Sequence, residues 1–314
     1  MARMTPSPAI RTAMGSVEWL LLILLGVIWG SGFFFAHIAV TEIPPLTLVL
    51  LRVGIAAVAL HVYLLAIGVS FAPALSRWRL FVALSLSNNI VPFALIFTGQ
   101  TVLGAGVASL LNATTPFWTI IIANAFTRDE KASWNKVAGV LLGIGGTAIM
   151  IGPGLIAGLG GPAWAKFALI GAAISYAIAL IVARRFRGMP STLVATGQVS
   201  TSTVIMIPVA LLANGTSGMV DLSALAWMSV LALALLSTSL GYLLYFTIIA
   251  RAGATNASLV TLIVPMSAIL LSAIFLGERL HLFEVAGMAL IAGGLLTIDG
   301  RLLPKTLQPR RAAA

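Results

Sequence analysis

The sequence predicts an all-α membrane protein with ten transmembrane helices, arranged as two five-helix repeats of inverted topology. Of its 314 residues, 60% are hydrophobic and only 8% are charged, whereas soluble domains carry roughly 25% charged residues. A soluble fold of this length could not cover its surface with so few charges, but a lipid-facing wall needs none. In addition, a segment of the first half recurs in the second half.

Ten apolar segments approach the roughly 20 residues that a helix needs to cross the hydrocarbon core. We expect helices because lipid cannot satisfy exposed backbone groups, and the alternating ten-residue pattern of outer-membrane barrels is missing. The first segment has the length of a full span and no small-residue cleavage site, so it is not interpreted as a removed signal peptide. The segments are Trp19–Val40, Leu46–Val69, Leu80–Gln100, Val102–Phe126, Trp134–Ile151, Trp164–Ala183, Leu193–Ala213, Leu225–Ile249, Ala257–Leu276 and Leu282–Ile298.

Basic residues gather on one side of this arrangement, which predicts a cytoplasmic location for both termini. The opposite side holds only Lys166 and Arg279. We therefore expect a multi-pass protein of the bacterial inner membrane with cytoplasmic tails at 1–17 and 301–314, and we attribute the net charge of +10 to orientation rather than to nucleic acid. The residues on the basic side are Arg3, Arg11, Arg77, Arg79, Arg128, Lys131, Lys136, Arg184, Arg185, Arg187, Arg251, Arg301, Lys305, Arg310 and Arg311.

The two halves of the chain resemble each other in one register. At an offset of 149, the segment 93–98 (FALIFT) aligns with 242–247 (YLLYFT), 104–109 (GAGVAS) with 253–258 (GATNAS), and Pro116 with Pro265. After one deletion, Glu130-Lys131 aligns with Glu278-Arg279. Apolar helices resemble each other by chance, but chance does not preserve a register through a proline and a charged loop pair. We expect repeats at 18–152 and 163–300.

The predicted number of spans gives the two repeats opposite orientations in the membrane. Because each unit has an odd number of spans, the second must begin on the opposite side of the membrane. Inverted repeats are typical of secondary transporters, whose binding site lies near the bilayer midplane between the repeats.

Several motifs resemble the EamA branch of the drug/metabolite transporter superfamily. They are Trp29-Gly30, Arg52, the repeated Gly-Ala-x-x-Ala-Ser before Pro116 and Pro265, and Gly277-Glu278-Arg279. The resemblance extends from about Trp19 to Ile298, and within the family it is strongest to YddG-type amino-acid exporters. It implies a carrier that moves small metabolites by alternating access.

Polar and deep aromatic side chains in spans are the candidates for a substrate cavity, because such residues are costly in lipid. The alternatives are interhelical hydrogen bonds for the polar residues and interfacial belts for the aromatic ones. The candidates are Trp29, Ser31, Phe33, Asn88, Asn89, Thr115, Trp118, Ser175, Tyr176, Ser239, Tyr242, Tyr245 and Thr261. Gln198, Ser200 and Thr201 rank lower because no repeat partner supports them.

Three prolines are predicted to bend helices. Pro92, Pro116 and Pro265 lie within spans, and a proline deprives the carbonyl four residues earlier of its amide partner. For Pro116 and Pro265 these carbonyls belong to Asn112 and Thr261. They could contact a solute, or nearby hydroxyls could satisfy them.

Arg52 is the only lysine or arginine that lies more than three residues inside a predicted span. It could attract a carboxylate substrate, or it could extend outward to the interface and pair with Glu42. Small residues four apart, such as Gly139 and Gly143, are expected to pack helices closely.

The missing residue types narrow the function. The chain has no cysteine and three scattered histidines, so we expect no enzyme, metal site or cofactor. Without a mid-span carboxylate, facilitated diffusion or exchange is the simpler mechanism. An uncharged cavity of this kind favours export of neutral or aromatic amino acids. Another solute class (drug, nucleoside or sugar derivative), a channel and a scaffold remain alternatives. The expected partners are a small-molecule substrate and the lipid bilayer, with no obligate protein partner.

Overall fold

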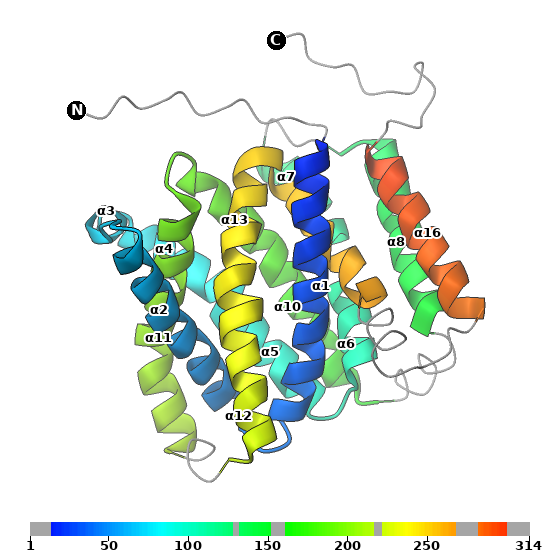
Figure 1. The fold of residues 1–314 in the computed structure, drawn as a ribbon. Coiled ribbons are helices and arrows are strands. Elements are labelled where there is room, and N and C mark those ends of the chain that lie inside the picture. The colour runs from blue at the N-terminus through cyan, green and yellow to red at the C-terminus, as the bar shows by residue number, and fades with distance from the viewer. Residues whose placement is uncertain (1–13, 128–131, 152–160, 217–221, 268–281, 300–314) are drawn as a thin grey trace.

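The computed structural model describes residues 14–127, 132–151, 161–216, 222–267 and 282–299, and all regular elements within these ranges are helical. Most of the helices lie side by side along one common direction (Figure 1). The predicted tails and the loop pairs Glu130-Lys131 and Glu278-Arg279 lie largely or wholly outside the described residues.

Six helical stretches of the described chain are long and apolar enough to cross a membrane. Two are the single helices α1 (Ser16–Ala39) and α2 (Pro45–Ala66), and a third is α11 (Ser191–Asn214). The others are composite: α4 (Trp78–Ser85), η1 (Leu86–Ile90) and α5 (Val91–Gln100); α10 (Ala163–Ala183) and η2 (Arg184–Phe186); and α12 (Ala224–Leu231), η3 (Ala232–Leu240) and α13 (Gly241–Ala252). The short α3 (Ala72–Leu75) precedes α4.

Shorter helices lie where the remaining spans are expected. They are α6 (Ala105–Asn112) with α7 (Thr115–Phe126), α8 (Trp134–Ile151), α14 (Ala254–Ser258) with helical residues 260–267, and α16 (Leu282–Asp299). The expected span Ala257–Leu276 extends beyond the described residues, so the total of ten stays a prediction.

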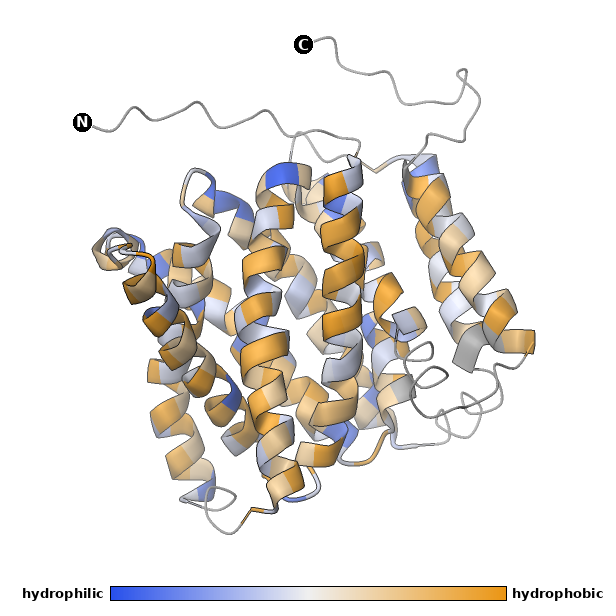
Figure 2. Cartoon of the chain, viewed as in Figure 1, coloured by the Kyte–Doolittle hydropathy of each residue, from blue (hydrophilic) through white to orange (hydrophobic). Residues whose placement is uncertain are grey.

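The outer faces of the helices are apolar. Leu20, Val58, Leu65, Phe126 and Leu212 are each more than 60% exposed, and Figure 2 shows hydrophobic residues along the helices, with hydrophilic ones more frequent near their ends. Large contiguous apolar surfaces are rare on soluble monomers, so this surface is suited to lipid.

Both halves interrupt their third helix at the same place. The π-helical η1 covers residues 86–90, and adding the offset of 149 gives 235–239, which lies inside the π-helical η3. Pro92 follows η1 at the second position of α5, and Gly241 follows η3 as the first residue of α13. π-Helical turns are rare in proteins, and those that occur are frequently found at functional sites. Their presence at equivalent positions of both halves makes this level of the bundle a candidate for function.

The fourth helix of each half is also broken. Residues 113–114 separate α6 from α7, and a turn at Leu259 separates α14 from residues 260–267. Pro116 lies at the second position of α7, and Pro265 lies within the helical residues 260–267. The Thr115 hydroxyl donates to the Asn112 carbonyl at 2.6 Å, so a neighbouring hydroxyl satisfies the carbonyl that Pro116 leaves without its amide.

Helices α8 and α16 approach each other through glycines. A Cβ added to Gly146 would lie 2.7 Å from the Gly287 carbonyl oxygen, and one added to Gly139 would lie 2.5 Å from the Gly294 carbonyl oxygen. Real side chains do not tolerate such distances, so only glycine permits this separation of the two backbones.

Replacing Gly146 by valine is expected to force these helices apart. The free energy of unfolding should fall by about 1–3 kcal/mol, the usual cost of overpacking, as measured by thermal denaturation in detergent. Gly145→Val is the matched control, because a Cβ at the neighbouring Gly145 meets nothing within 4 Å among the described residues. Equal melting temperatures for both variants would show that the contact is not needed.

Candidate functional site

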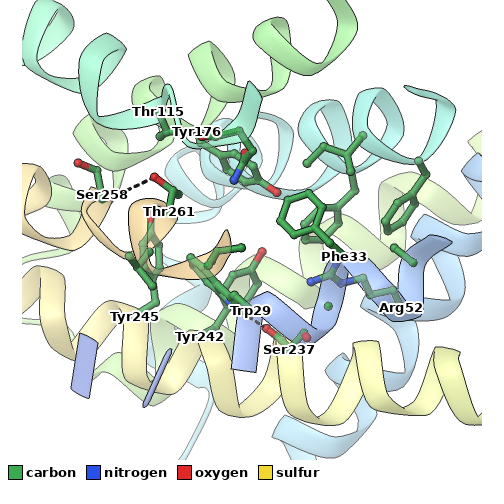
Figure 3. A pocket seen from close by; sticks show the side chains of 18 of the residues that line it. Trp29, Phe33, Arg52, Thr115, Tyr176, Ser237, Tyr242, Tyr245, Ser258 and Thr261 are labelled. Carbon is green, nitrogen blue, oxygen red and sulfur yellow. Dashed lines mark hydrogen bonds between the residues drawn. The ribbon is translucent and has the colours of Figure 1, made fainter. Parts of the chain in front are cut away.

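A cavity lies between helices of the two halves (Figure 3). The first half contributes residues from α1, α2, α5, α6 and α7, and the second half contributes residues from α10, η3, α13, α14 and the segment 260–267. The structure brings together these predicted residues on its wall: Trp29, Phe33, Thr115, Tyr176, Tyr242, Tyr245 and Thr261.

Repeat-equivalent positions line the cavity from both halves. At the offset of 149, the wall contains the pairs Phe93 and Tyr242, Ile96 and Tyr245, Asn112 and Thr261, and Thr115 and Val264. The two repeats therefore line the cavity with equivalent positions that carry different side chains. In each of the first two pairs, the second repeat supplies a tyrosine.

An aromatic cluster forms one part of the wall. The ring centroids of Trp29 and Tyr245 are 5.2 Å apart, and Tyr242 meets Trp29 edge to face at 6.4 Å. The Trp29 indole N–H donates to the carbonyl of Ser237 at 2.8 Å. A Cβ on Gly241 would lie 2.6 Å from that indole nitrogen, so glycine is required there for the indole to reach η3.

Asn88 and Asn89 lie behind the wall and not on it. The Asn88 amide donates to the Gln198 side-chain oxygen at 3.1 Å, and Gln198 donates to the Asn89 side-chain oxygen at 2.7 Å. Asn89 donates to Ser202 at 2.8 Å and also accepts from the Tyr242 hydroxyl. These bonds link η1, α11 and α13, so the polar groups serve interhelical pairing, the alternative recognised in the sequence.

Four other predicted residues are also absent from the wall. Ser31 donates to the carbonyl of Ile28, Ser175 to that of Ser87 and Ser239 to that of Ala234. The Trp118 indole packs against Phe117 at 5.4 Å, and its N–H has no partner among the described residues. Their hydroxyls thus satisfy helix carbonyls, while Trp118 fills space near the break between α6 and α7.

Arg52 lies on the cavity wall, which corrects two expectations. It does not extend outward to Glu42: it is 9% exposed, and its Nε donates to the Thr238 hydroxyl at 2.7 Å. Glu42 instead accepts from the hydroxyl and the backbone N–H of Ser223, which lower the pKa of its carboxyl. The expectation of an uncharged cavity is therefore wrong, because η3 supplies a buried partner for the arginine.

Sequence reasoning missed several wall residues. Phe93, Phe97 and Gln100 lie four and three residues apart on α5, a spacing that places them on one helix face. That spacing, together with the alignment of Phe93 with Tyr242, was the available signal. Among the described residues, no group of three or more acids and histidines could hold a metal ion.

An apolar helical bundle with breaks in repeat-equivalent helices around an internal polar and aromatic cavity is the architecture of a multi-pass membrane transporter. This chain belongs to the EamA-like transporter family, whose model matches residues 17–152 and again residues 163–298. The match confirms the family resemblance and the presence of two repeats.

Curated relatives carry transporter names at moderate identity. A probable amino-acid metabolite efflux pump of Escherichia coli is 27% identical over 90% of this chain and 94% of its own length. A probable terminal-alkyne amino-acid exporter of Streptantibioticus cattleyicolor is 27% identical over 93% and 95%. An uncharacterized transporter of Archaeoglobus fulgidus is 25% identical over 90% and 98%.

The fold is also found among solved structures. One crystal structure matches with a TM-score of 0.73 and 20% sequence identity, covering 90% of this chain and 97% of the other. At this identity the likeness concerns the fold alone.

The network behind the wall predicts unequal effects of two substitutions in α11. Gln198→Leu leaves the Asn88 amide without its acceptor, which should lower the free energy of unfolding by about 1–3 kcal/mol. Ser200→Ala should not lower stability, because the buried Ser200 hydroxyl has no partner among the described residues to lose. Thermal denaturation of both variants tests this, and equal stability would refute the network's role.

Proposed function

We propose that this protein is a secondary transporter of the bacterial inner membrane that exports neutral and aromatic amino acids and related compounds. Transport proceeds by alternating access through the central cavity. The observation that carries the proposal is the cavity wall, because the two repeats contribute equivalent positions to it. A change in how the repeats pack would alter which end of the cavity is open.

Three contacts support an inverted arrangement of the repeats. Glu18 at the start of α1 pairs with Arg251 at the end of α13 at 2.6 Å, whereas Glu42, just after α1, accepts from Ser223, just before α12. The helix formed by α12, η3 and α13 therefore runs opposite to α1, as Figure 1 also shows.

The equivalent helix of the first repeat runs the other way. Gln100, at the end of α5, donates to the carbonyl of Phe33 in the second half of α1 at 3.1 Å, so α4, η1 and α5 run in the same direction as α1. Equivalent helices that point in opposite directions are what an inverted repeat with ten spans requires, with both termini in the cytoplasm.

The wall's chemistry supports amino acids as substrates. Trp29, Phe33, Tyr242 and Tyr245 offer aromatic surface for an apolar side chain and ring faces that attract an ammonium group. Phosphorylated sugars would require several cationic side chains, and Arg52 is the only one among the described residues that line the wall. The names of the efflux relatives agree with this class.

The coupling mechanism follows from what lines the wall. Neither a carboxylate nor a histidine is among the lining residues of the described chain, so facilitated diffusion or exchange is the proposed mode. Proteoliposomes preloaded with amino acids should accelerate uptake of a labelled amino acid, with no dependence on an imposed pH gradient. Movement of sugar phosphates or organic cations alone would contradict the amino-acid assignment, and the absence of acceleration by internal substrate would favour a channel.

Two neighbouring phenylalanines on α1 provide a matched pair of variants. Phe33 lines the cavity, whereas Phe34 is 57% exposed on the outer face. Phe33→Ala should lower amino-acid uptake at least about tenfold through lost contact area, while Phe34→Ala should transport at the wild-type rate. Trp29→Ala and Tyr242→Ala, which alter the centre of the aromatic cluster, should abolish transport. Membrane abundance controls for insertion, and normal uptake by all three wall variants would remove the aromatic cluster from the site.

A further inference from the structure

Arg52 is a buried cation without a carboxylate partner in the described chain. The acids whose side chains the structure describes are Glu18 and Glu42, and they are bonded to Arg251 and Ser223. Burying an unpaired charge costs several kcal/mol, and an ionisable residue at membrane depth is a candidate functional group for that reason. Its positive charge therefore remains available to a solute in the cavity.

The protein holds the guanidinium of Arg52 in one orientation. Its Nε donates to the Thr238 hydroxyl at 2.7 Å, and Thr238 in turn donates to the carbonyl of Leu233 at 2.8 Å. The guanidinium carbon lies 3.9 Å from the centroid of the Phe93 ring. With one edge bonded and one face stacked, the guanidinium is oriented for recognition.

The two terminal nitrogens of Arg52 have no hydrogen-bond partner among the described residues, and they are not fully enclosed. Figure 3 shows the Arg52 head directed toward the side chains that line the cavity. A guanidinium presents its terminal N–H groups as a fork that matches the two oxygens of a carboxylate. The free edge of Arg52 is therefore suited to an anionic group in the cavity.

Two acceptor oxygens on the wall lack donors. The Gln100 side-chain nitrogen donates to the Phe33 carbonyl at 3.1 Å, which leaves its oxygen, and likewise the side-chain oxygen of Asn112, buried without a partner in the described chain. A buried acceptor without a donor is unfavourable by about 1–3 kcal/mol. A solute ammonium group would supply N–H donors of the kind that they lack.

Gln100 lies on the same face of α5 as the two phenylalanine rings beside Arg52, Phe93 at 3.9 Å and Phe97 at 5.9 Å from the guanidinium carbon, and it is seven residues beyond Phe93. Gln100 follows Phe97 by three residues on α5, roughly 4.5 Å further along the helix. Arg52 and Gln100 both line the cavity.

We propose that Arg52 binds the carboxylate of the transported solute while Gln100 and Asn112, both on the cavity wall, accept from its ammonium group. The site thus selects a zwitterionic α-amino acid head and leaves the solute's side chain to the aromatic cluster. This inference rests on the proposed transport function. A single arginine matches a monoanion, whereas a phosphate dianion would remain only partly neutralised.

The test compares L-phenylalanine with its derivatives in counterflow assays. L-Phenylalaninamide lacks the carboxylate, and 3-phenylpropionate lacks the ammonium group. Wild type should transport phenylalanine and discriminate against both. Arg52→Gln should lower phenylalanine uptake about 10- to 100-fold, the usual range for a lost charge-assisted bond, and should abolish discrimination against the amide. Gln100→Leu should reduce phenylalanine uptake while leaving 3-phenylpropionate uptake unchanged.

Stability measurements separate a binding role from a structural one. Arg52→Gln removes a charge that has no acid partner in the described chain, so its melting temperature should equal or exceed that of wild type. Wild type should also gain thermal stability from phenylalanine but not from its amide. Thr238→Val keeps the charge of Arg52 and removes the hydroxyl that orients it. It should therefore raise KM for phenylalanine, but should lower phenylalanine uptake less than Arg52→Gln does.

The outcomes distinguish this inference from the transport function. Equal transport of phenylalanine and its amide by wild type, or unchanged discrimination in Arg52→Gln, would overturn the binding role of Arg52 and leave the transporter intact. If Arg52→Gln does not fold, unchanged KM in Thr238→Val together with equal thermal shifts by phenylalanine and its amide would overturn it. Counterflow of other solutes but of no amino acid would overturn both.

Discussion

Polar groups inside a bilayer must find partners within the protein, and this constraint organises the structure. Lipid offers no hydrogen bonds, so Asn88, Asn89 and Gln198 bond to one another, and many Ser and Thr hydroxyls bond to helix carbonyls three to five residues earlier. A few buried polar atoms of the described chain have no hydrogen-bond partner. Two of them, the side-chain oxygens of Gln100 and Asn112, belong to residues that line the same cavity as Arg52, whose hydrogen bond to Thr238 uses only Nε. Together these groups suit the cavity to a polar solute.

The two repeats line the cavity with equivalent positions but supply different types of side chain. Both halves interrupt the third helix with π-helical turns and break the fourth helix, so the same local irregularities shape the cavity from each half. The first repeat contributes the cation, the amide acceptors, Trp29 and three phenylalanines, whereas the second contributes Tyr176, Tyr242 and Tyr245. A solute between them would contact the charged and amide groups of the first repeat and aromatic surface from both.

The hydropathy of the sequence and the register of its repeats were good guides to how far along a helix each candidate residue lies. Trp29 was recognisable because it lies too deep for an interfacial belt, and Tyr242 because it aligns with Phe93 of the other repeat. Sequence position gives depth along a helix but not the direction in which a side chain points or the partner that it finds. Asn88 and Asn89 therefore had the pattern of cavity residues, although both of their side chains are hydrogen-bonded to Gln198 on α11. Arg52 could not be separated from an interfacial arginine without the position of Thr238.

The proposed alternating access requires that the two repeats enclose a cavity that opens to one side of the membrane at a time. Because the chain has no cysteine, single cysteines can be placed directly at Thr261 on the wall and at Ser202 behind it. Small membrane-impermeant thiol reagents should label Thr261→Cys from one side, amino acids should change that labelling, and Ser202→Cys should stay unlabelled. Simultaneous labelling of Thr261→Cys from both sides in every condition, or no labelling at all, would contradict alternating access through this cavity.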